Sequence, residues 1–329
     1  MGFIKKIVFI AGVFAVLLIA YTAYWAQQPI IGSEHPVMEF AVQPGSGARS
    51  TGQQIANAGI PLNPILFELL ARASGKSAKL KAGNYALKPG TTPTRLVDQL
   101  VRGEFAQESL IVIEGWTFKQ MRQAIAAHPA LKHDSVSLSD SELLAKVTPD
   151  YKVPEGLFFP DTYRFAKGSS DLAIFRNAHA LLLKRLASGW ETRDPSVPYK
   201  TPYDALIMAS IVEKETGQKS ERGMIAGVFV NRLKLGMLLQ TDPTVIYGMG
   251  DKFQGGIGKR DLQTDTPYNT YTRAGLPPTP IALPGVEALL AALNPEKTDA
   301  LYFVSRRDGT SEFSTNLDAH NRAVNKYQR

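Results

Sequence analysis

Glu213 and Glu215 stand two residues apart at the end of an apolar run, ALIMASIV, whose composition predicts a helix buried on nearly every side. Burial disfavours the charged form of a carboxyl group and raises its pKa, and the negative end of the helix dipole acts in the same direction. A carboxyl group with a raised pKa can donate a proton near neutral pH. Residues two apart point about 200° apart around a helix, so only one glutamate can face a given cleft.

The alternative interpretation is that both carboxylates are solvated at the end of this helix. Each would then pair with a neighbouring cation, and the candidates are Lys214, Lys219 and Arg222. Most Glu residues in proteins are exposed and contribute little beyond such pairs. The residues that follow the two glutamates favour the first interpretation.

Amide, hydroxyl and tyrosine side chains gather in the motifs LLQTDPTVIYGMG and DTPYNTYTRAGLPPTPIALPG. Amides and hydroxyls can hydrogen-bond the hydroxyl groups of a sugar, and tyrosine offers both a ring face and a hydroxyl. We predict a saccharide-binding surface made of Gln240, Thr241, Asp242, Tyr247, Tyr268, Asn269 and Tyr271. Asp242 precedes a proline and is equally a candidate turn residue, and Tyr268 and Tyr271 are alternatively packed inside the fold.

A second polar motif, TNLDAHN, lies near the end of the chain and contributes Asn316 and His320 as candidates for the same cleft. A single histidine is more often structural than functional. The chain has five His and no Cys. The absence of cysteine excludes disulfides and thiolate metal sites. We predict no metal site and no cofactor.

The helix that carries the two glutamates has a clear beginning at Thr201-Pro202-Tyr203-Asp204. Thr201 can cap the helix, Pro202 suits its first position, and Asp204 places a carboxylate in the first turn. Gly217 is the predicted C-terminal cap. The glutamates are therefore expected in the last turn.

The N-terminus contains an uncharged stretch, residues 7–26, which is long enough to cross the roughly 30 Å hydrocarbon core of a membrane. Lys5 and Lys6 precede it, and the first acidic residue after it is Glu34, so the N-terminus is expected in the cytoplasm. The aromatic residues Tyr21, Tyr24 and Trp25 mark its far end. A cleaved signal peptide is the alternative, but its apolar region would be only about 7–15 residues long.

Residues 38–103 predict strand, helix, helix, strand and helix. MEFAV alternates as a strand does, NPILFELLARAS has helical spacing, AGNYAL is a short strand, and TPTRLVDQLVRG is a capped amphipathic helix. This order resembles a LysM-like module, a type of module that binds glycans containing N-acetylglucosamine. The residues that carry the resemblance, Phe67, Leu80, Gly83, Tyr85, Leu96 and Leu100, are mostly expected in the core.

Further elements are expected between this module and the buried helix. IVI predicts a strand at 111–113, Thr117 caps the next helix, SDSELLAKV is a short helix, and residues 171–188 form an amphipathic helix. Trp116 is a candidate for stacking on a sugar, although a tryptophan at such a corner is more often core.

The formal net charge of +7 suits an anionic partner such as a membrane surface or an acidic polymer, or serves solubility alone. No dense Lys/Arg block interleaved with aromatic residues is present, so the sequence does not indicate a nucleic-acid partner.

Four motifs, ASIVEKETG, NRLKLGMLLQTDPTVIYG, TPYNTYTRAGLPP and LYFV with TNLDAHN, resemble the YceG-like family of endolytic murein transglycosylases. EGLFFPDTY at 155–163 and the anchor followed by a LysM-like module also resemble this family. The resemblance implies that Glu213, the first glutamate of VEKET, is the catalytic acid and base.

The resemblance further implies cleavage of the β-1,4 bond between N-acetylmuramic acid and N-acetylglucosamine in nascent strands, with 1,6-anhydro ends as products and glycan polymerisation terminated. It implies the inner membrane as the location, a periplasmic catalytic part, and peptidoglycan synthases such as penicillin-binding proteins as partners. A hydrolytic muramidase and a non-catalytic glycan-binding scaffold are the alternatives.

The expected fold class is α+β. The predicted organisation is a cytoplasmic tail at 1–6, a transmembrane helix at 7–26, a linker at 27–37, a LysM-like βααβ module at 38–108, and a YceG-like catalytic domain at 109–329 with its core at 155–329.

Overall fold

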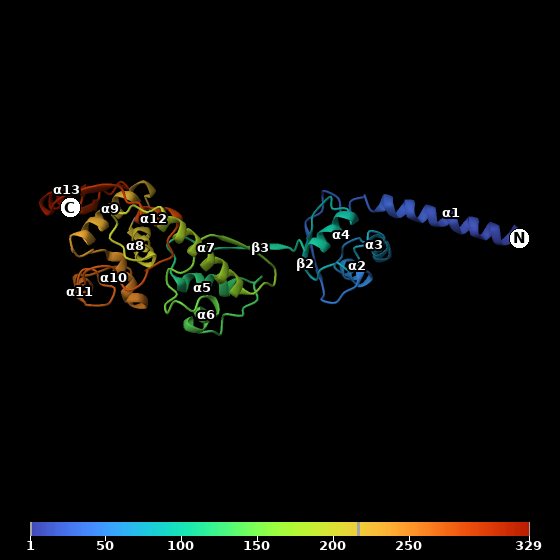
Figure 1. Cartoon of the computed structure of the whole chain (residues 1–329), viewed down its shortest axis with the longest axis horizontal. Coiled ribbons are helices and arrows are strands. Elements are labelled where there is room, and N and C mark those ends of the chain that lie inside the picture. Colours follow the sequence, from blue (N-terminus) through green and yellow to red (C-terminus); the bar gives the residue numbers. More distant parts are fainter. Residues whose placement is uncertain (1, 216–217, 329) are drawn as a thin grey trace. The chain divides into compact units, whose positions relative to one another are not determined.

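The computed structural model of the chain describes residues 2–215 and 218–328. The chain divides into two compact units (Figure 1). Unit 1 contains residues 1–108 and 164–169, and unit 2 contains residues 109–163 and 170–329. Helices and short two-stranded sheets occur together, which agrees with the expected α+β class.

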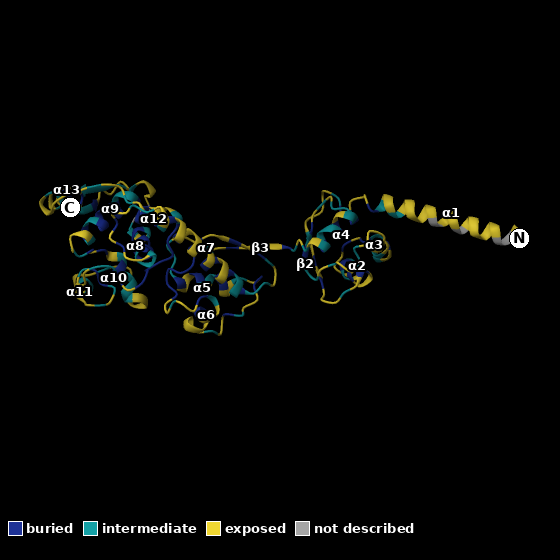
Figure 2. Cartoon of the chain, in the orientation of Figure 1, coloured by how far each residue is buried: buried dark blue, intermediate teal, exposed yellow. Residues whose placement is uncertain are grey.

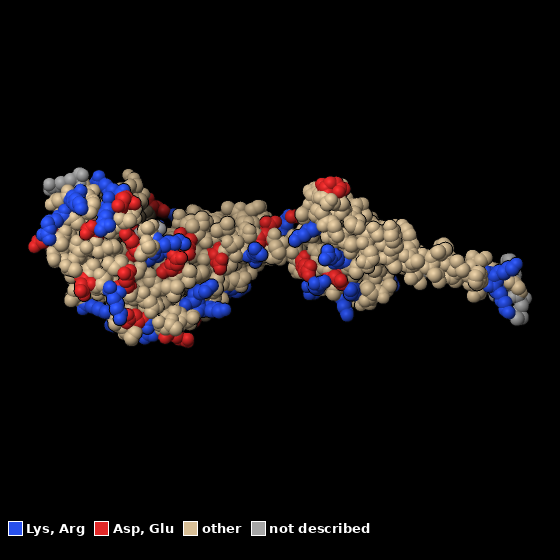
Figure 3. All heavy atoms as spheres, turned by 90° about the horizontal axis from the view of Figure 1, so that it is seen from above, with Lys and Arg blue, Asp and Glu red and all other residues tan. Residues whose placement is uncertain are grey.

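Helix α1 (Gly2–Trp25) is, within the described residues, the one helix long and apolar enough to cross a membrane. Its side chains are largely exposed (Figure 2). Lys5 and Lys6 lie at its N-terminal end, and the rest of the helix carries no charge (Figure 3). These properties fit a single membrane-spanning helix.

The rest of unit 1 has the predicted order of strand, helix, helix, strand and helix. Strands β1 (Met38–Val42) and β2 (Gly83–Leu87) pair in antiparallel fashion, with Phe40 opposite Tyr85. The helices are α2 (Ala48–Asn57), α3 (Pro64–Ala73) and α4 (Pro93–Arg102). Tyr85 and Phe67 are fully buried between these elements, so alternate residues of the strands face one small core.

The predicted caps of α4 are present. Thr92 accepts a hydrogen bond from the Arg95 N–H, and Gly103 ends the helix with φ of 73°, a left-handed conformation that glycine adopts without strain.

Residues 27–37, predicted as a linker, are in part packed into unit 1. Ala26 and Ile31 are each 3% exposed. The Ile30 N–H donates to the Thr91 carbonyl at 2.9 Å, and the Gly90 N–H donates to the Ile31 carbonyl at 3.1 Å. The two isoleucines of the stretch pack against an apolar core, and their burial outweighs the polar and proline content of the stretch.

Strands β3 (Gln107–Ile111) and β4 (Thr162–Ala166) form a second two-stranded sheet, and the division between the two units falls within both strands. Strand β3 begins four residues before the predicted strand. The chain passes from unit 1 to unit 2 between residues 108 and 109, and residues 164–169 belong to unit 1.

Unit 2 begins with three helices, which are α5 (Phe118–Ala127), α6 (Asp140–Val147) and α7 (Asp171–Glu191). The predicted cap at Thr117 is present as a capping box with Gln120. The remaining helices are α8 (Pro202–Glu215), α9 (Arg222–Lys234), α10 (Asp242–Met249), α11 (Lys259–Gln263), α12 (Val286–Leu293) and α13 (Leu317–Tyr327). Short 3₁₀ turns stand at Lys219–Glu221 and Gly250–Lys252, and β5 (Tyr302–Ser305) pairs with β6 (Ser311–Ser314) in a hairpin.

Helix α8 is the centre of unit 2. Its residues 205–212 are all buried, as the apolar run predicted, and it contacts α7, α9, α10 and α12 (Figure 2). At its beginning the Thr201 hydroxyl accepts from the Asp204 N–H at 3.2 Å, which confirms the predicted cap. The predicted cap at Gly217 lies outside the described residues.

Candidate active site

The last turn of α8 directs its two glutamates into two different pockets, as their spacing predicted. Glu213 lines a pocket of about 380 Å³ together with Glu114, Trp116 and Arg222. Glu215 lines a separate groove of about 610 Å³. A groove of this size is in the usual range for a ligand site.

The groove around Glu215 is built by several elements of unit 2. Helix α9, the segment before α10, the loop before α12, the β5–β6 hairpin and α13 all contribute to it. Its principal polar and aromatic residues are Glu215, Arg232, Gln240, Asp242, Tyr271, Tyr302 and His320. Three of the predicted saccharide-binding residues, Gln240, Asp242 and Tyr271, therefore share one groove with a glutamate.

Burial raises the pKa of Glu215 to about 7, because the charged carboxylate loses most of its hydration there. The Thr241 hydroxyl donates a hydrogen bond to Glu215 and partly offsets this effect, whereas the charge of Asp242 adds to it. The Arg232 guanidinium acts in the lowering direction. Glu215 is therefore protonated in a large fraction of molecules near neutral pH.

The backbone beside Glu215 is held in an uncommon conformation. Gln240 has φ of 51°, in the left-handed region that few residues other than glycine adopt. The Gln240 N–H donates to the Thr270 carbonyl, and the Thr241 N–H donates to the Thr270 hydroxyl, both at 3.1 Å. Strained backbone that its neighbours hold in place is concentrated at functional sites.

Asp242 and Tyr271 form a second polar pair in the groove. The Tyr271 hydroxyl donates to Asp242 Oδ1 at 2.6 Å. Burial, and after it the neighbouring carboxylate of Asp242, raises the pKa of Tyr271, so its hydroxyl stays protonated. The hydrogen bond holds the Asp242 carboxylate, a hydrogen-bond acceptor, and the ring of Tyr271 in place at the groove.

Arg232, Tyr302 and His320 are stacked along another side of the groove. The guanidinium of Arg232 lies 5.0 Å from the ring centre of Tyr302, and the rings of Tyr302 and His320 are stacked with centres 5.2 Å apart. Arg232 donates to the Leu301 carbonyl at 2.7 Å and to the Leu239 carbonyl at 2.8 Å, which joins β5 to the segment before α10. Burial, and next the charge of Arg232, lowers the pKa of His320.

Glu213, the predicted acid and base, is occupied by structural contacts. Its side chain is 5% exposed and forms an ion pair with Arg222 at 3.0 Å. Its other oxygen accepts from the N–H of Gly285, the residue that precedes α12, at 2.9 Å. Burial raises the pKa of Glu213, while the Gly285 N–H and Arg222 act in the opposite direction. Both oxygens hold α8, α9 and α12 together.

Five of the predicted saccharide-binding residues do not line the groove, and one of them is Thr241, whose hydroxyl is bonded to Glu215. The Asn269 side chain is fully buried and donates to the carbonyls of Asp261, Leu262 and Thr264, so it organises a loop and is not available to a sugar. Asn316 caps α13 by accepting from the Ala319 N–H at 2.9 Å. Sequence patterns could not separate these roles, because the side chains that cap and brace loops are also those that bind sugars.

The other two are tyrosines that contact each other. The Tyr247 hydroxyl donates to Glu155 at 3.2 Å, and the Tyr268 hydroxyl lies 2.8 Å from the Thr279 hydroxyl. Their rings meet edge to face with centres 4.9 Å apart. Glu155 was not predicted as a special residue, yet it is only 5% exposed, and burial raises its pKa to about 7.

Within residues 2–215 and 218–328, no group of three or more His, Cys, Asp or Glu side chains could hold a metal ion. The groove offers the half-buried acid Glu215, amide and hydroxyl groups, and aromatic rings. Such a set can transfer a proton to a bound saccharide and hold its hydroxyl groups.

Comparison with known proteins gives a consistent result. The model of the YceG-like family matches residues 40–326. An endolytic murein transglycosylase of Bacillus subtilis (strain 168) is 32% identical over 91% of this chain and 87% of its own length. One of Streptococcus pneumoniae serotype 2 is 28% identical over 90% of this chain and 59% of its own length. A crystal structure of a yceG-like protein of Listeria monocytogenes has a TM-score of 0.54 and 29% identity, covering 88% of this chain and 99% of that one.

Proposed function

Because this chain belongs to the YceG-like family, we propose that it is an endolytic murein transglycosylase, a lyase that cleaves the glycan strands of peptidoglycan. The bond that it cleaves is the β-1,4 bond between N-acetylmuramic acid and N-acetylglucosamine. The products carry 1,6-anhydro-N-acetylmuramic acid ends, and the cleavage ends the growth of nascent strands. The observation that supports this proposal best is the half-buried Glu215 of raised pKa in a groove lined by amide, hydroxyl and aromatic side chains.

Our proposal assigns the acid and base role to Glu215, whereas the sequence analysis assigned it to Glu213. Glu215 shares its groove with Gln240, Asp242 and Tyr271. Glu213 has both oxygens engaged by Arg222 and the Gly285 N–H, which favours a fixed carboxylate over a proton donor. Glu213 is then a positioning residue that holds the end of α8 in place.

In the proposed reaction, protonated Glu215 gives its proton to the glycosidic oxygen as the bond to C1 breaks. The carboxylate that remains accepts the proton of the muramyl 6-hydroxyl, whose oxygen forms the new bond to C1. No water is consumed, and Glu215 ends the cycle protonated. One carboxylate suffices because the nucleophile belongs to the substrate, and a well-oriented intramolecular attack can lower the barrier by about 7–11 kcal/mol.

The neighbours of Glu215 have supporting roles in this proposal. The Thr241 hydroxyl orients the carboxyl group through the hydrogen bond that it donates. Gln240 and the pair of Asp242 and Tyr271 hydrogen-bond the saccharide, and Tyr302 and His320 offer ring faces to it. Each of these groups lies on a different segment, so the groove exists only in the folded unit.

The test is digestion of purified glycan by the wild-type chain, by Glu215→Gln and by Glu213→Gln, with the ends read by mass spectrometry. We expect no anhydro ends from Glu215→Gln, although its melting temperature stays close to that of the wild type. Glu213→Gln should still release them at a reduced rate, expressed per folded molecule. Full activity of Glu215→Gln would refute the assignment, and loss of activity in folded Glu213→Gln alone would restore the role to Glu213.

A hydrolytic muramidase is the second candidate, because Asp242 lies in the same groove as Glu215 and could act as a second carboxylate. Its product would be one water heavier than the anhydro product. Asp242→Asn should retain cleavage if the tethered hydroxyl is the nucleophile, and should lose it if Asp242 activates water.

We further propose that α1 anchors the chain in the inner membrane, with the N-terminus in the cytoplasm and the chain that follows α1 in the periplasm. Lys5 and Lys6 before the apolar stretch support this orientation. The chain has no cysteine, so single cysteines at Gly2 and at Lys79 can be labelled separately in intact cells. A thiol reagent restricted to the periplasm should label only position 79.

Two finer interactions belong to the same proposal. Residues 38–108 act as a LysM-like module that binds glycan, and peptidoglycan synthases such as penicillin-binding proteins are partners at the membrane. The βααβ order of unit 1 supports the first. Glycan pull-down by Glu215→Gln and cross-linking in cells test these two interactions.

A further inference from the structure

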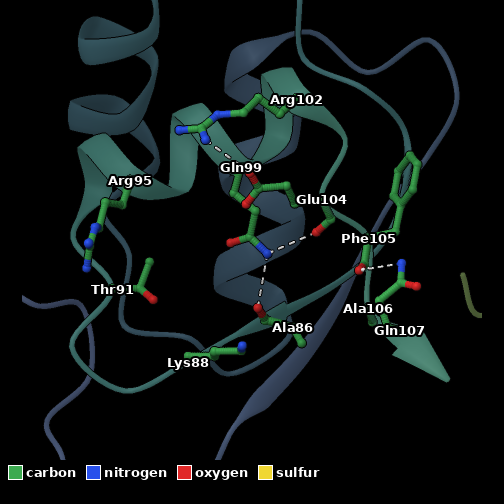
Figure 4. Close-up of a pocket in the computed structure, with 10 residues that line it drawn as sticks. All are labelled: Ala86, Lys88, Thr91, Arg95, Gln99, Arg102, Glu104, Phe105, Ala106 and Gln107. Carbon is green, nitrogen blue, oxygen red and sulfur yellow. Dashed lines mark hydrogen bonds and ion pairs between the residues drawn. The ribbon is translucent and has the colours of Figure 1, made fainter. Parts of the chain in front are cut away.

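Unit 1 contains a pocket of about 660 Å³ beside α4, and Ala86 of β2 is part of its lining (Figure 4). It is formed by α4, by the segment after β2 and by the chain that leads into β3. Its lining includes Lys88, Thr91, Arg95, Gln99, Arg102 and Phe105. The Gln99 side-chain amide donates to the carbonyls of Ala86 and Glu104, both at 3.1 Å, and so joins two walls of the pocket.

The pocket carries an excess of positive charge. Arg102 forms an ion pair with Glu104 at 3.2 Å, which leaves Lys88 and Arg95. Both side chains are exposed, and neither has an ion pair with any residue that the structure describes. Asp98, the acidic residue of α4, is paired with Lys76 at 2.5 Å. Two cations therefore remain uncompensated at this pocket, which favours an anionic ligand.

The same part of unit 1 is bonded to the end of α1. The Ala26 carbonyl, one residue beyond α1, accepts from the Thr94 N–H at 3.2 Å and from the Thr94 hydroxyl at 2.9 Å. The Thr91 carbonyl accepts from the Ile30 N–H at 2.9 Å. Arg95 follows Thr94 directly and, like Thr91, lines the pocket. The residues that directly follow α1 are thus hydrogen-bonded to Thr91, which lines the pocket, and to Thr94, which precedes the lining residue Arg95.

We infer that this pocket binds the phosphate group of an anionic membrane lipid. The inference rests on the proposal that α1 spans the membrane. The polar interface of a bilayer is roughly 5–8 Å deep on each side, so groups bonded to the end of the anchor lie at the height of lipid phosphates. Arg95 can bind phosphate oxygens in bidentate fashion, and Lys88 adds a point charge. Ala86, Phe105 and Ala106 give the pocket an apolar wall.

The test uses the full chain in detergent micelles, with bound lipid counted by native mass spectrometry during titration with phosphatidylglycerol or phosphatidylcholine. We expect tighter binding of phosphatidylglycerol. In Lys88→Gln/Arg95→Gln this affinity should fall about 25-fold, because each cation near lipid phosphates contributes about fivefold. The matched control is Arg49→Gln/Lys79→Gln, which removes two exposed cations of unit 1 that do not line this pocket and should change the affinity less than twofold.

Equal binding of both lipids, or equal losses in the two double variants, would overturn the inference. Glycerol 1-phosphate tests whether the ligand of this pocket is a soluble phosphate and not a lipid. If it displaces phosphatidylglycerol at the same concentration as the lipid itself, the pocket is a site for free phosphate and the lipid assignment is wrong. A carboxylate-bearing muropeptide that displaces the lipid at the same concentration would likewise show that the lipid assignment is wrong.

The result is separable from that of the proposed reaction. Glu215→Gln, which the proposed function expects to be inactive on glycan, should retain full phosphatidylglycerol binding because Glu215 belongs to unit 2. Failure of lipid binding in that chain and in the wild type leaves the glycan digestion as an independent test.

Discussion

The protonation of one side chain, Glu215, sets the pH range in which the proposed reaction can begin. The group must be protonated to act as an acid, and its pKa is about 7. The rate of glycan cleavage should therefore fall as pH rises through about 7. This dependence is a property of the groove, because an exposed glutamate would already be charged at that pH.

Two neighbours of Glu215 should move this pH limit in opposite directions. The Thr241 hydroxyl stabilises the carboxylate, so Thr241→Val should move the alkaline limb of kcat/KM to higher pH. Asp242 destabilises the carboxylate by repulsion, so Asp242→Asn should move the limb to lower pH. Profiles between pH 5 and 9 measure both shifts.

A control for general damage is Thr272→Val, which removes a hydroxyl that bonds Asp265 away from the groove and should leave the limb in place. If the two variants beside Glu215 shift the limb in the same direction, the group that titrates is not the carboxyl of Glu215.

Sequence reasoning located the groove but not the direction of each side chain. The polar and aromatic run brought Gln240, Asp242 and Tyr271 to attention, and the structure places these three together. Which glutamate faces them depends on how α9 and the loop before α12 pack around the end of α8, and spacing along α8 does not contain that information. Arg232 gave no signal, because it lies within a helix that is mostly buried.

Arg222, at the start of α9, joins three helices at the end of α8. It pairs with Glu213 of α8 at 3.0 Å and with Glu287 of α12 at 2.9 Å, and its side chain is 7% exposed. Removing one partner of a buried ion pair leaves an uncompensated charge, which costs about 3–5 kcal/mol. Arg222→Met should lower the free energy of unfolding by about that amount in urea titrations.

Two further variants separate the charge from the packing. Glu213→Leu/Arg222→Met removes both charges and should recover most of the loss. Arg260→Met removes an exposed cation of α11 and should change stability by less than about 0.5 kcal/mol. If Arg222→Met is as stable as Arg260→Met, the ion pair does not hold the helices together.

Glu155 connects α5 with α10, and its burial makes stability depend on pH. It accepts from the Phe118 N–H at 2.9 Å and from the Tyr247 hydroxyl at 3.2 Å. Its pKa is raised from 4.5 to about 7, so the folded state holds a proton that the unfolded chain releases between these values. The contribution of Glu155 is present below about pH 4.5 and is lost as pH rises to about 7.

The loss amounts to about 3 kcal/mol over this range, since each pKa unit is worth about 1.4 kcal/mol. Melting temperatures at pH 5, 6, 7 and 8 should therefore decrease less in Glu155→Gln than in the wild type. Glu191→Gln, a change at an exposed residue of α7, should follow the wild type. A curve of Glu155→Gln parallel to that of the wild type would show that Glu155 does not titrate in this range.

Helices and strands were the most predictable part of the molecule. Thr117 and Thr201 cap the helices that follow them, as their positions indicated, because capping depends on local chain geometry. The segment after Gln240 forms α10. Pro243 in its first turn favours the helix, since a proline there lacks only a hydrogen bond that the helix start does not need.

In the whole molecule, the packing of residues 26–31 determines where a stable soluble fragment can begin. Ala26 and Ile31 are buried in unit 1, and Ile30 packs partly against the same core. A fragment of residues 33–329 should therefore be less stable in unit 1 than a fragment of residues 22–329, by about 3 kcal/mol for the lost isoleucine burial. Hydrogen exchange of the β1–β2 amides measures the difference, and equal protection in the two fragments would contradict it.

The assignment of whole segments to units was only partly accessible from the sequence. The order of predicted strands and helices placed the end of the βααβ part at residue 108, and the two units also divide between residues 108 and 109. The return of residues 164–169 to unit 1 depends on long-range contacts, such as the bond from the Asn84 amide to the Lys167 carbonyl at 3.0 Å. Sequence periodicity reports local structure and does not contain such contacts.

The hydrogen bonds between Ala26 and Thr94 leave no free residues between α1 and the fold of unit 1. A flexible joint would need such residues, so the βααβ part of unit 1 must turn together with α1. The tilt of a membrane helix follows the thickness of the bilayer around it. If α1 spans the membrane as proposed, a thicker or thinner bilayer would consequently reorient the βααβ part of unit 1 against the membrane surface.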